Sequence, residues 1–181
     1  MARYLLGIDA GTTSFKMALF TEEGTAVHIV KEEYVLLTPK NGWVEYEAEN
    51  YWTLFCRLLH RLILESKVNP EEILALSISS QGETLICLDE DGQPLMNAIV
   101  WLDNRSEKEA DEIRSRFGRR AVYEKSGQGD VTATWPATKI LWLRKNRPDV
   151  FMKTQKYMLL EDYLIFRLTG SCVCEENLWA S

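Results

Sequence analysis

The stretch that decides the fold is Gly7-Ile8-Asp9-Ala10-Gly11-Thr12-Thr13-Ser14-Phe15-Lys16, near the start of the chain. An apolar run that begins at Tyr4 ends in an acidic residue, and a turn of one glycine and three hydroxyl residues follows. Beyond the turn, apolar side chains recur with period two at positions 15, 17 and 19, which is the spacing of a half-buried strand. The sequence therefore predicts two strands joined by a short, open turn.

The turn has the composition of a phosphate-binding site. Gly11 has no Cβ, so backbone N–H groups can approach a phosphate closely, and the three hydroxyls after it supply further donors. A lysine on the second strand adds a positive charge. The candidate phosphate ligands are Gly11, Thr12, Thr13, Ser14 and Lys16.

Asp9, at the end of the first strand, is the candidate metal ligand. Mg²⁺ keeps much of its hydration shell and takes few carboxylates, so one aspartate can hold it through water. The alternative is a β-turn rich in glycine and threonine, in which Asp9 satisfies a turn N–H and Lys16 is a surface charge. The chain has no Gly-x-x-x-x-Gly-Lys-Ser/Thr run, so the turn is not a Walker A loop, and it leads into a strand instead of a helix.

Strands and helices alternate along the rest of the chain. Apolar positions at spacings of three and four residues predict a helix from about Ala48 to Ser66. Ser106 and Glu109 form a capping-box pattern at the start of a later helix that Gly118 ends. Further strands are predicted at residues 27–30, 73–79, 83–88 and 98–101, and further helices at residues 137–145 and 161–168. With no low-complexity segment and no flexible linker, the chain is expected to form one α/β unit.

Composition narrows the class of protein. A length of 181 residues with 46% apolar and 27% charged content is typical of a globular domain with a core. The 21 Lys and Arg against 27 Asp and Glu give a net charge of −6, which provides no basic field for nucleic acid or an anionic membrane. No apolar run reaches the roughly 20 residues of a transmembrane helix, and Asp9 comes too early for a signal-peptide core. We therefore expect a cytoplasmic protein.

The cysteines are expected to be reduced and structural. Cys56 and Cys87 lie in apolar runs, while Cys172 and Cys174 form a lone Cys-x-Cys without a second ligand pair or a histidine nearby in the sequence. A zinc site would need two paired clusters or adjacent histidines, so metal binding by these thiols is the weaker interpretation.

Taken with four further segments, the turn resembles the first phosphate motif of the actin-like ATPase fold, and the chain is identified as a member of the FGGY family of carbohydrate kinases. The segments are Gly42-Trp43-Val44-Glu45, Ser77-Ile78-Ser79-Ser80-Gln81-Gly82-Glu83-Thr84, Asn97-Ala98-Ile99-Val100-Trp101-Leu102-Asp103-Asn104-Arg105 and Thr138-Lys139-Ile140-Leu141-Trp142-Leu143. They occur in the family's order, and the similarity runs from about Tyr4 to Ser181. The resemblance implies an α/β fold of the actin-like, ribonuclease H-like class, with a mixed sheet and helices, forming the N-terminal half of a two-domain kinase.

The resemblance also implies an acceptor pocket lined by Gln81, Gly82, Glu83 and Trp101. The amide of Gln81 can donate to and accept from vicinal hydroxyls, and a carboxylate such as Glu83 can accept from them. Trp101 would supply a flat apolar wall for the carbon face of a sugar. Without the resemblance, Glu83 would be interpreted as a solvated strand-edge charge and Trp101 as a packing residue.

The acceptor segment departs from two subgroups of the family. Glycerol kinases carry an arginine where Gly82 stands, and xylulokinases share Gln81 but continue with Met-His. A glycine beside Glu83 leaves room, so we expect an acceptor larger than glycerol, with a pentulose such as xylulose favoured. Thr134 and Trp135 lie where the family places another wall of the pocket.

Phosphoryl transfer also needs a base that takes the proton of the acceptor hydroxyl. The resemblance places the catalytic Asp in a Gly-Asp-Gln-type segment beyond Ser181 and the adenosine pocket in a second domain. Residues 1–181 are therefore expected to be an incomplete N-terminal kinase domain that is inactive alone. No catalytic residue is assigned in this chain, since Asp103, Asp130 and Asp162 stand in no such motif.

Two functions are weighed on these grounds. The first is the N-terminal part of an ATP-dependent carbohydrate kinase, which transfers the γ-phosphate of ATP to a hydroxyl of a sugar or polyol with Mg²⁺ as cofactor. The second is a non-catalytic actin-like half-domain that binds a sugar or a partner protein. An actin-like ATPase of the chaperone type is weaker, because it leaves the segment from Gln81 to Glu83 without a role. The expected partner is a small sugar or polyol, with no nucleic acid and no membrane, and a homodimer is left open.

Overall fold

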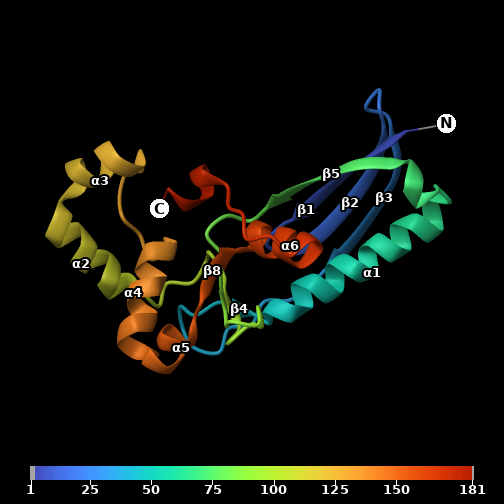
Figure 1. Ribbon diagram of the computed structural model, residues 1–181. Coiled ribbons are helices and arrows are strands. Elements are labelled where there is room, and N and C mark those ends of the chain that lie inside the picture. Colours follow the sequence, from blue (N-terminus) through green and yellow to red (C-terminus); the bar gives the residue numbers. More distant parts are fainter. Residues whose placement is uncertain (1–2, 181) are drawn as a thin grey trace. The chain divides into compact units, whose positions relative to one another are not determined.

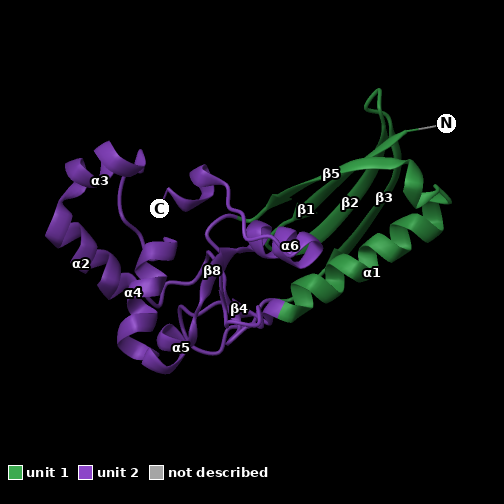
Figure 2. Cartoon of the chain, viewed as in Figure 1, with its two compact units in different colours: residues 1–35, 49–81 green, residues 36–48, 82–181 purple. Residues whose placement is uncertain are grey.

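The computed structural model describes residues 3–180, which fall into two compact units (Figure 2). The first unit comprises Met1–Val35 and Glu49–Gln81, and the second comprises Leu36–Ala48 and Gly82–Ser181. The sequence predicted one α/β unit and gave no sign of this division into two compact units. Each boundary between the units falls between consecutive residues, so the sequence has no linker segment of distinct composition to mark it.

The first unit is a four-stranded sheet with one long helix beside it (Figure 1). The strands are β1 (Tyr4–Ala10), β2 (Ser14–Thr21), β3 (Ala26–Glu33) and β5 (Ile73–Ser80), in the order β3-β2-β1-β5. β1 runs antiparallel to β2 and parallel to β5, so the sheet is mixed. A short 3-10 helix, η1 (Pro70–Glu72), precedes β5.

The helix of this unit, α1 (Ala48–Ser66), has the bounds that its apolar spacing predicts. Its buried stripe consists of Tyr51, Leu54, Phe55, Leu58 and Leu62. The ring of Phe55 meets the ring of Phe15 edge to face, with 6.2 Å between centroids. Alternate residues of β1 and β2 are buried on the same side, because side chains of a strand point to opposite faces.

The second unit is built on a smaller antiparallel sheet. Its strands are β4 (Glu45–Tyr46), β7 (Ala98–Ile99), β6 (Leu85–Leu88) and β8 (Lys156–Leu159), in that order across the sheet. Its helices are α2 (Glu107–Phe117), α3 (Arg119–Ser126), α4 (Pro136–Asn146), α5 (Pro148–Lys153) and α6 (Leu160–Thr169), with a 3-10 turn η2 (Glu176–Trp179).

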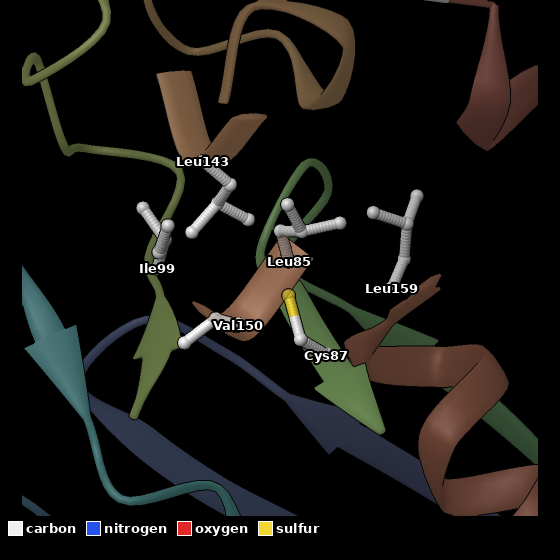
Figure 3. Close-up of a cluster of buried hydrophobic side chains, with 6 residues drawn as sticks. All are labelled: Leu85, Cys87, Ile99, Leu143, Val150 and Leu159. Atoms are coloured by element: carbon white, nitrogen blue, oxygen red, sulfur yellow. The ribbon is translucent and has the colours of Figure 1, made fainter. Parts of the chain in front are cut away.

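A core cluster of this unit is formed by side chains of β6, β7, β8, α4 and α5, which Figure 3 shows close together. The cluster consists of Leu85, Cys87, Ile99, Leu143, Val150 and Leu159. Burial raises the pKa of the Cys87 thiol to about 12, so this cysteine is neutral and behaves as a small apolar residue. Cys87 and the exposed Cys56, Cys172 and Cys174 form no disulfide in the part of the chain that the structure describes.

Most predicted elements are confirmed, and the differences have local causes. The strand expected to begin at Glu83 begins at Leu85, because Glu83 has a φ of 59° and cannot continue a strand. The capping box expected at Ser106 is absent, since its buried hydroxyl donates to the carbonyl oxygen of Ala133 at 3.0 Å instead. The sequence analysis did not predict α3, α5 and β8, which are short.

Over residues 3–180, no helix is long and apolar enough to cross a membrane.

Candidate functional site

The β1–β2 hairpin brings the predicted metal ligand and the predicted phosphate lysine together. Asp9 and Lys16 are opposite each other in the antiparallel register. Lys16 Nζ donates to Asp9 Oδ2 at 3.0 Å, and both side chains are about half exposed, at 47% and 48%. This carboxylate and ammonium therefore form an accessible ion pair beside the turn.

Gly11 lies where a side chain would crowd the turn. Its N–H donates to the carbonyl oxygen of Ser14 at 3.1 Å. A Cβ at position 11 would lie 3.1 Å from that same oxygen and 3.5 Å from Asp9 Oδ1. The absence of a side chain keeps the backbone of the turn open next to the carboxylate, as expected for close approach of a ligand.

The three hydroxyl residues of the turn differ in accessibility. Thr13 is exposed, Thr12 is half-buried, and Ser14 is buried with 8% of its surface exposed. Thr13 and the backbone of the turn are thus open to a ligand, while Ser14 begins β2 beneath them. Thr13 is therefore more accessible than Ser14.

Two tyrosines that the sequence analysis did not single out hold the turn in place. The hydroxyl of Tyr34 donates to the carbonyl oxygen of Gly11, and the Tyr34 N–H donates to the carbonyl oxygen of Thr13 at 3.1 Å. The rings of Tyr34 and Tyr51 meet edge to face, with 5.8 Å between centroids. Tyr51 shares the helical spacing of the α1 stripe, but nothing in the sequence shows that its side chain and Tyr34 would meet, because that depends on contacts between distant segments.

Gln81 joins the same network. Its N–H donates to the carbonyl oxygen of Ala10 at 3.0 Å, and its Nε2 donates to the hydroxyls of Tyr34 at 3.3 Å and Tyr51 at 3.0 Å. The Gln81 side chain is buried, and within the part of the chain that the structure describes, its Oε1 is a buried acceptor without a partner. Such an acceptor is costly unless a ligand or water satisfies it.

Asp9 is the candidate ligand for Mg²⁺ beside the turn. Residues 3–180 contain no group of three His, Cys, Asp or Glu side chains that could enclose a metal ion. Asp9 alone is a hard oxygen ligand beside an open turn. Because Mg²⁺ is commonly bound by one or two carboxylates with waters and substrate phosphates, this single carboxylate fits an ion that is shared with phosphates.

The remaining predicted acceptor residues belong to the second unit, whereas Gln81 belongs to the first. Glu83 and the side chain of Trp101 are half-buried. The hydroxyl oxygen of Thr84, which is fully buried, accepts a hydrogen bond from the Trp101 N–H at 3.2 Å. Thr84 therefore ties the segment that carries Glu83 to the segment that carries Trp101. A Cβ built at Gly82 would meet no atom within 4 Å.

A buried lysine lies beneath this segment. Lys139, on α4, is fully buried, and its Nζ donates to the carbonyl oxygen of Glu83 at 2.7 Å. The pKa of Lys139 is lowered to about 7, mainly by burial; Glu83 and Asp103 act in the opposite direction, and the neighbouring Arg105 acts in the same direction as burial. The family resemblance included Lys139, but nothing in the sequence indicated that it would be buried.

The other matching segments meet in a buried ion cluster in the second unit. Arg105 donates to Asp103 through Nε and Nη2, both at 2.8 Å, and to Glu45 Oε1 at 2.7 Å. The Arg105 guanidinium lies over the Trp43 ring, 3.8 Å from its centroid, and 5.2 Å from that of Trp142. Asp103 is fully buried, and both of its carboxylate oxygens accept hydrogen bonds inside this cluster.

Trp135, expected near a wall of the acceptor pocket, is a packing residue. It is 7% exposed and clusters with Ala110 and Val131. Thr134 remains half-buried, and its hydroxyl exchanges a hydrogen bond of 2.7 Å with that of Thr132. Packing of α2 against this segment, which the sequence does not reveal, accounts for the burial of Trp135.

The chain belongs to the FGGY family of carbohydrate kinases, whose N-terminal domain profile matches residues 4–181. It is 36% identical over 180 residues to a glycerol kinase of Thermococcus gammatolerans, covering 97% of this chain and 36% of that protein. It is 36% identical over 173 residues to a xylulose kinase of Lactococcus lactis, covering 95% of this chain and 34% of that protein. Among solved structures, a gluconate kinase from Lactobacillus acidophilus superposes with a TM-score of 0.90 and 32% identity, covering 99% of this chain and 36% of that one.

These similarities confirm the predicted family and fold class. The mixed sheet and helices are the α/β architecture of the N-terminal half of these kinases, within the actin-like ATPase fold. The chain spans only about a third of the length of the relatives it matches, at 36% and 34%.

Proposed function

We propose that this chain is the N-terminal part of an ATP-dependent carbohydrate kinase, which transfers the γ-phosphate of ATP to a hydroxyl of a sugar or polyol. The observation that carries the proposal is the accessible pair of Asp9 and Lys16 beside the open turn at Gly11, in a chain of this family. A carboxylate for a metal ion and an ammonium for phosphate oxygens, adjacent to free backbone, are the groups that phosphoryl transfer requires.

In this proposal, the turn binds and orients the phosphates. The backbone at Gly11 and the hydroxyls of Thr12, Thr13 and Ser14 donate hydrogen bonds, and Lys16 supplies positive charge. Asp9 would hold Mg²⁺, with water in the remaining coordination positions, and the ion would neutralise charge on the phosphates. Binding of the ion and phosphates would replace the ion pair of Asp9 and Lys16, which costs little because that pair is exposed.

The acceptor is assigned to the segment that begins at Gln81. The Glu83 carboxylate accepts hydrogen bonds from acceptor hydroxyls, the ring of Trp101 covers an apolar face of the sugar, and the unpartnered Oε1 of Gln81 is a further acceptor. Space around Gly82 supports an acceptor larger than glycerol, and we favour a pentulose such as xylulose. Relatives of this chain are named for glycerol, xylulose and gluconate, so the family offers all three chemistries.

The base and the adenosine pocket are proposed to lie in the remainder of a longer protein. The basis is that this chain matches an N-terminal domain and spans 36% of a relative's length. Residues 1–181 alone would then bind weakly and turn over nothing.

The test is a coupled assay of ADP release by the intact protein with Mg-ATP and glycerol, xylulose or gluconate. We expect the highest kcat/KM with xylulose. ADP release with none of the three acceptors would contradict a kinase acting on these substrates, and a preference for glycerol would contradict the pentulose assignment.

The variant Gly82→Arg tests whether open space at this position sets acceptor size. We expect it to lower kcat/KM for xylulose at least about tenfold, because the arginine fills the space that the longer acceptor needs. Gly129→Arg is the matched control, since a Cβ at Gly129 also meets no atom within 4 Å but the residue lies outside the acceptor segment. If both variants changed kcat/KM equally, Gly82 would not line the acceptor pocket.

A further inference from the structure

Glu83 has a backbone conformation that a residue with a side chain rarely adopts. Its φ of 59° lies in the left-handed region, where only glycine is free of steric strain, and one other non-glycine described residue, Lys67, has a positive φ. Such a conformation persists only where the surrounding structure imposes it, and it is found most often at functional sites. A group that contacts the backbone of Glu83 is therefore a candidate for imposing this conformation.

Lys139 makes that contact. Its Nζ donates to the Glu83 carbonyl oxygen at 2.7 Å, and not to the carboxylate of the same residue. Between residues 3 and 180, the Glu83 carboxylate forms no hydrogen bond and no ion pair. The lysine thus binds the backbone carbonyl of Glu83. In an ordinary Lys–Glu salt bridge it would bind the carboxylate, which here remains accessible to a ligand.

Lys139 is itself held rigidly. The preceding residue, Thr138, is fully buried, and its hydroxyl donates to the carbonyl oxygen of Trp135 at 2.9 Å and meets the Ser106 hydroxyl at 3.0 Å. One turn later, Leu143 enters the core of the second unit. The α4 backbone is therefore anchored on both sides of Lys139, whose buried Nζ contacts the peptide that follows Glu83.

We propose that Lys139 is a positioning residue that holds Glu83 in its left-handed conformation and so aims the Glu83 carboxylate at the acceptor sugar. The direction of the carboxylate toward a sugar rests on the proposed function, whereas the hold on the backbone does not. Arg105 and Asp103 are the other charged groups that act on Lys139, together with Glu83 itself. A buried lysine is costly, and fixing the backbone of a ligand-binding residue accounts for its place.

The first experiment tests the backbone role and needs no enzyme activity. Lys139→Met is combined with either Glu83→Ala or Glu83→Gly in the intact protein, and amide hydrogen exchange is measured over residues 83–85. Both substitutions at position 83 remove the carboxylate, but only alanine is strained at this φ. We expect Lys139→Met to accelerate exchange at least about tenfold with alanine and less than about threefold with glycine.

Equal acceleration in the two backgrounds would overturn the proposal, because it would show that the lysine does not act on the conformation of residue 83. Lys139→Gln, which keeps a donor on a shorter side chain, is measured in parallel. If both variants of Lys139 unfold the protein whichever residue stands at position 83, the lysine is purely structural and the proposal fails.

The second experiment tests the consequence for the acceptor. In otherwise unaltered intact protein, we expect Lys139→Met to raise the KM for the sugar at least about tenfold and to change the KM for Mg-ATP less than about twofold. Lys153→Met, on the exposed end of α5, is the matched control and should change neither constant. A parallel rise in both constants would contradict positioning of the acceptor, and a protein inactive even without substitution would count against the proposed function instead.

Discussion

At the scale of single residues, we expect Asp9 to matter for catalysis but little for the stability of the fold. Both side chains are about half exposed, so the pair contributes at most about 1 kcal/mol to folding. In the intact protein, Asp9→Asn should lower kcat at least about 100-fold, because an amide holds Mg²⁺ poorly beside phosphates. The KM for the sugar and the thermal midpoint should change little. Steady-state kinetics and calorimetry measure these quantities.

Glu33→Gln is the control for this prediction. It removes the acidic partner of another exposed pair on the same sheet, since Lys31 Nζ donates to Glu33 at 2.7 Å. This variant should leave kcat unchanged. A wild-type kcat for Asp9→Asn would remove Asp9 from the mechanism.

The residues of the site differ in how far the sequence predicts them. Period-two spacing places Asp9 opposite Lys16 across a two-strand turn, so their proximity follows from local sequence. The burial of Gln81 depends on tyrosine hydroxyls contributed by two other segments, and the positive φ of Glu83 depends on a lysine 56 positions later. Contacts of this kind are set by tertiary structure, and no local pattern encodes them.

At the scale of elements, protonation of Lys139 on α4 is expected to lower the free energy of unfolding. Burial lowers the pKa of Lys139 from 10.5 to about 7, so between these values the unfolded chain holds a proton that the folded chain has released. Stability should therefore rise with pH from about 7 toward 10 relative to Lys139→Met, by at most about 5 kcal/mol. Urea denaturation at pH 7, 8 and 9 measures the difference. For Lys153→Met, the free energy of unfolding should change with pH by the same amount as in the wild type.

The two acidic hairpin turns provide a matched pair of glycines. Gly24 and Gly92 have φ values of 86° and 77°, but a Cβ at Gly92 would lie 2.9 Å from the ring of Phe166, whereas one at Gly24 would meet nothing within 4 Å. Gly24→Ala should cost about 1 kcal/mol through backbone strain alone. Gly92→Ala should cost about 3 kcal/mol, because overpacking against α6 adds to that strain. Equal losses in denaturant titrations would show that the Phe166 ring moves aside freely.

Elements were predictable where their own sequence carried the signal. The stripe of α1 and the alternation in β1 and β2 gave the correct elements because each buries one face. β6, although buried at all four positions, was predicted with its start two residues too early, whereas the four-residue strand β8 was not predicted. Ser106 illustrates the remaining difficulty, since its hydroxyl bonds to Ala133, 27 positions away, in preference to its own helix.

At the scale of the whole molecule, three of the four cysteines are exposed and one is buried, so their reactivities should differ. Cys56, Cys172 and Cys174 are exposed, while Cys87 lies in the core cluster of the second unit with its pKa raised to about 12. A thiol-labelling reagent should modify three cysteines within minutes, and the fourth only as fast as the second unit opens.

A variant with the three exposed cysteines replaced by serine leaves Cys87 as the single reporter. Its labelling should accelerate with urea in step with the loss of circular dichroism. Rapid labelling without denaturant would contradict the buried position of Cys87.

The parallel pairing of β1 with β5 has a consequence for synthesis on the ribosome. Tyr4 pairs with Ile73, and residues 36–48, which lie between them in the sequence, belong to the other unit. At about 5–20 residues per second, β1 emerges several seconds before its parallel neighbour exists. During that interval the nascent β1–β2–β3 meander exposes the edge of β1 in addition to that of β3, so the β1 edge is where a chaperone, or another nascent chain, would compete with native pairing to β5.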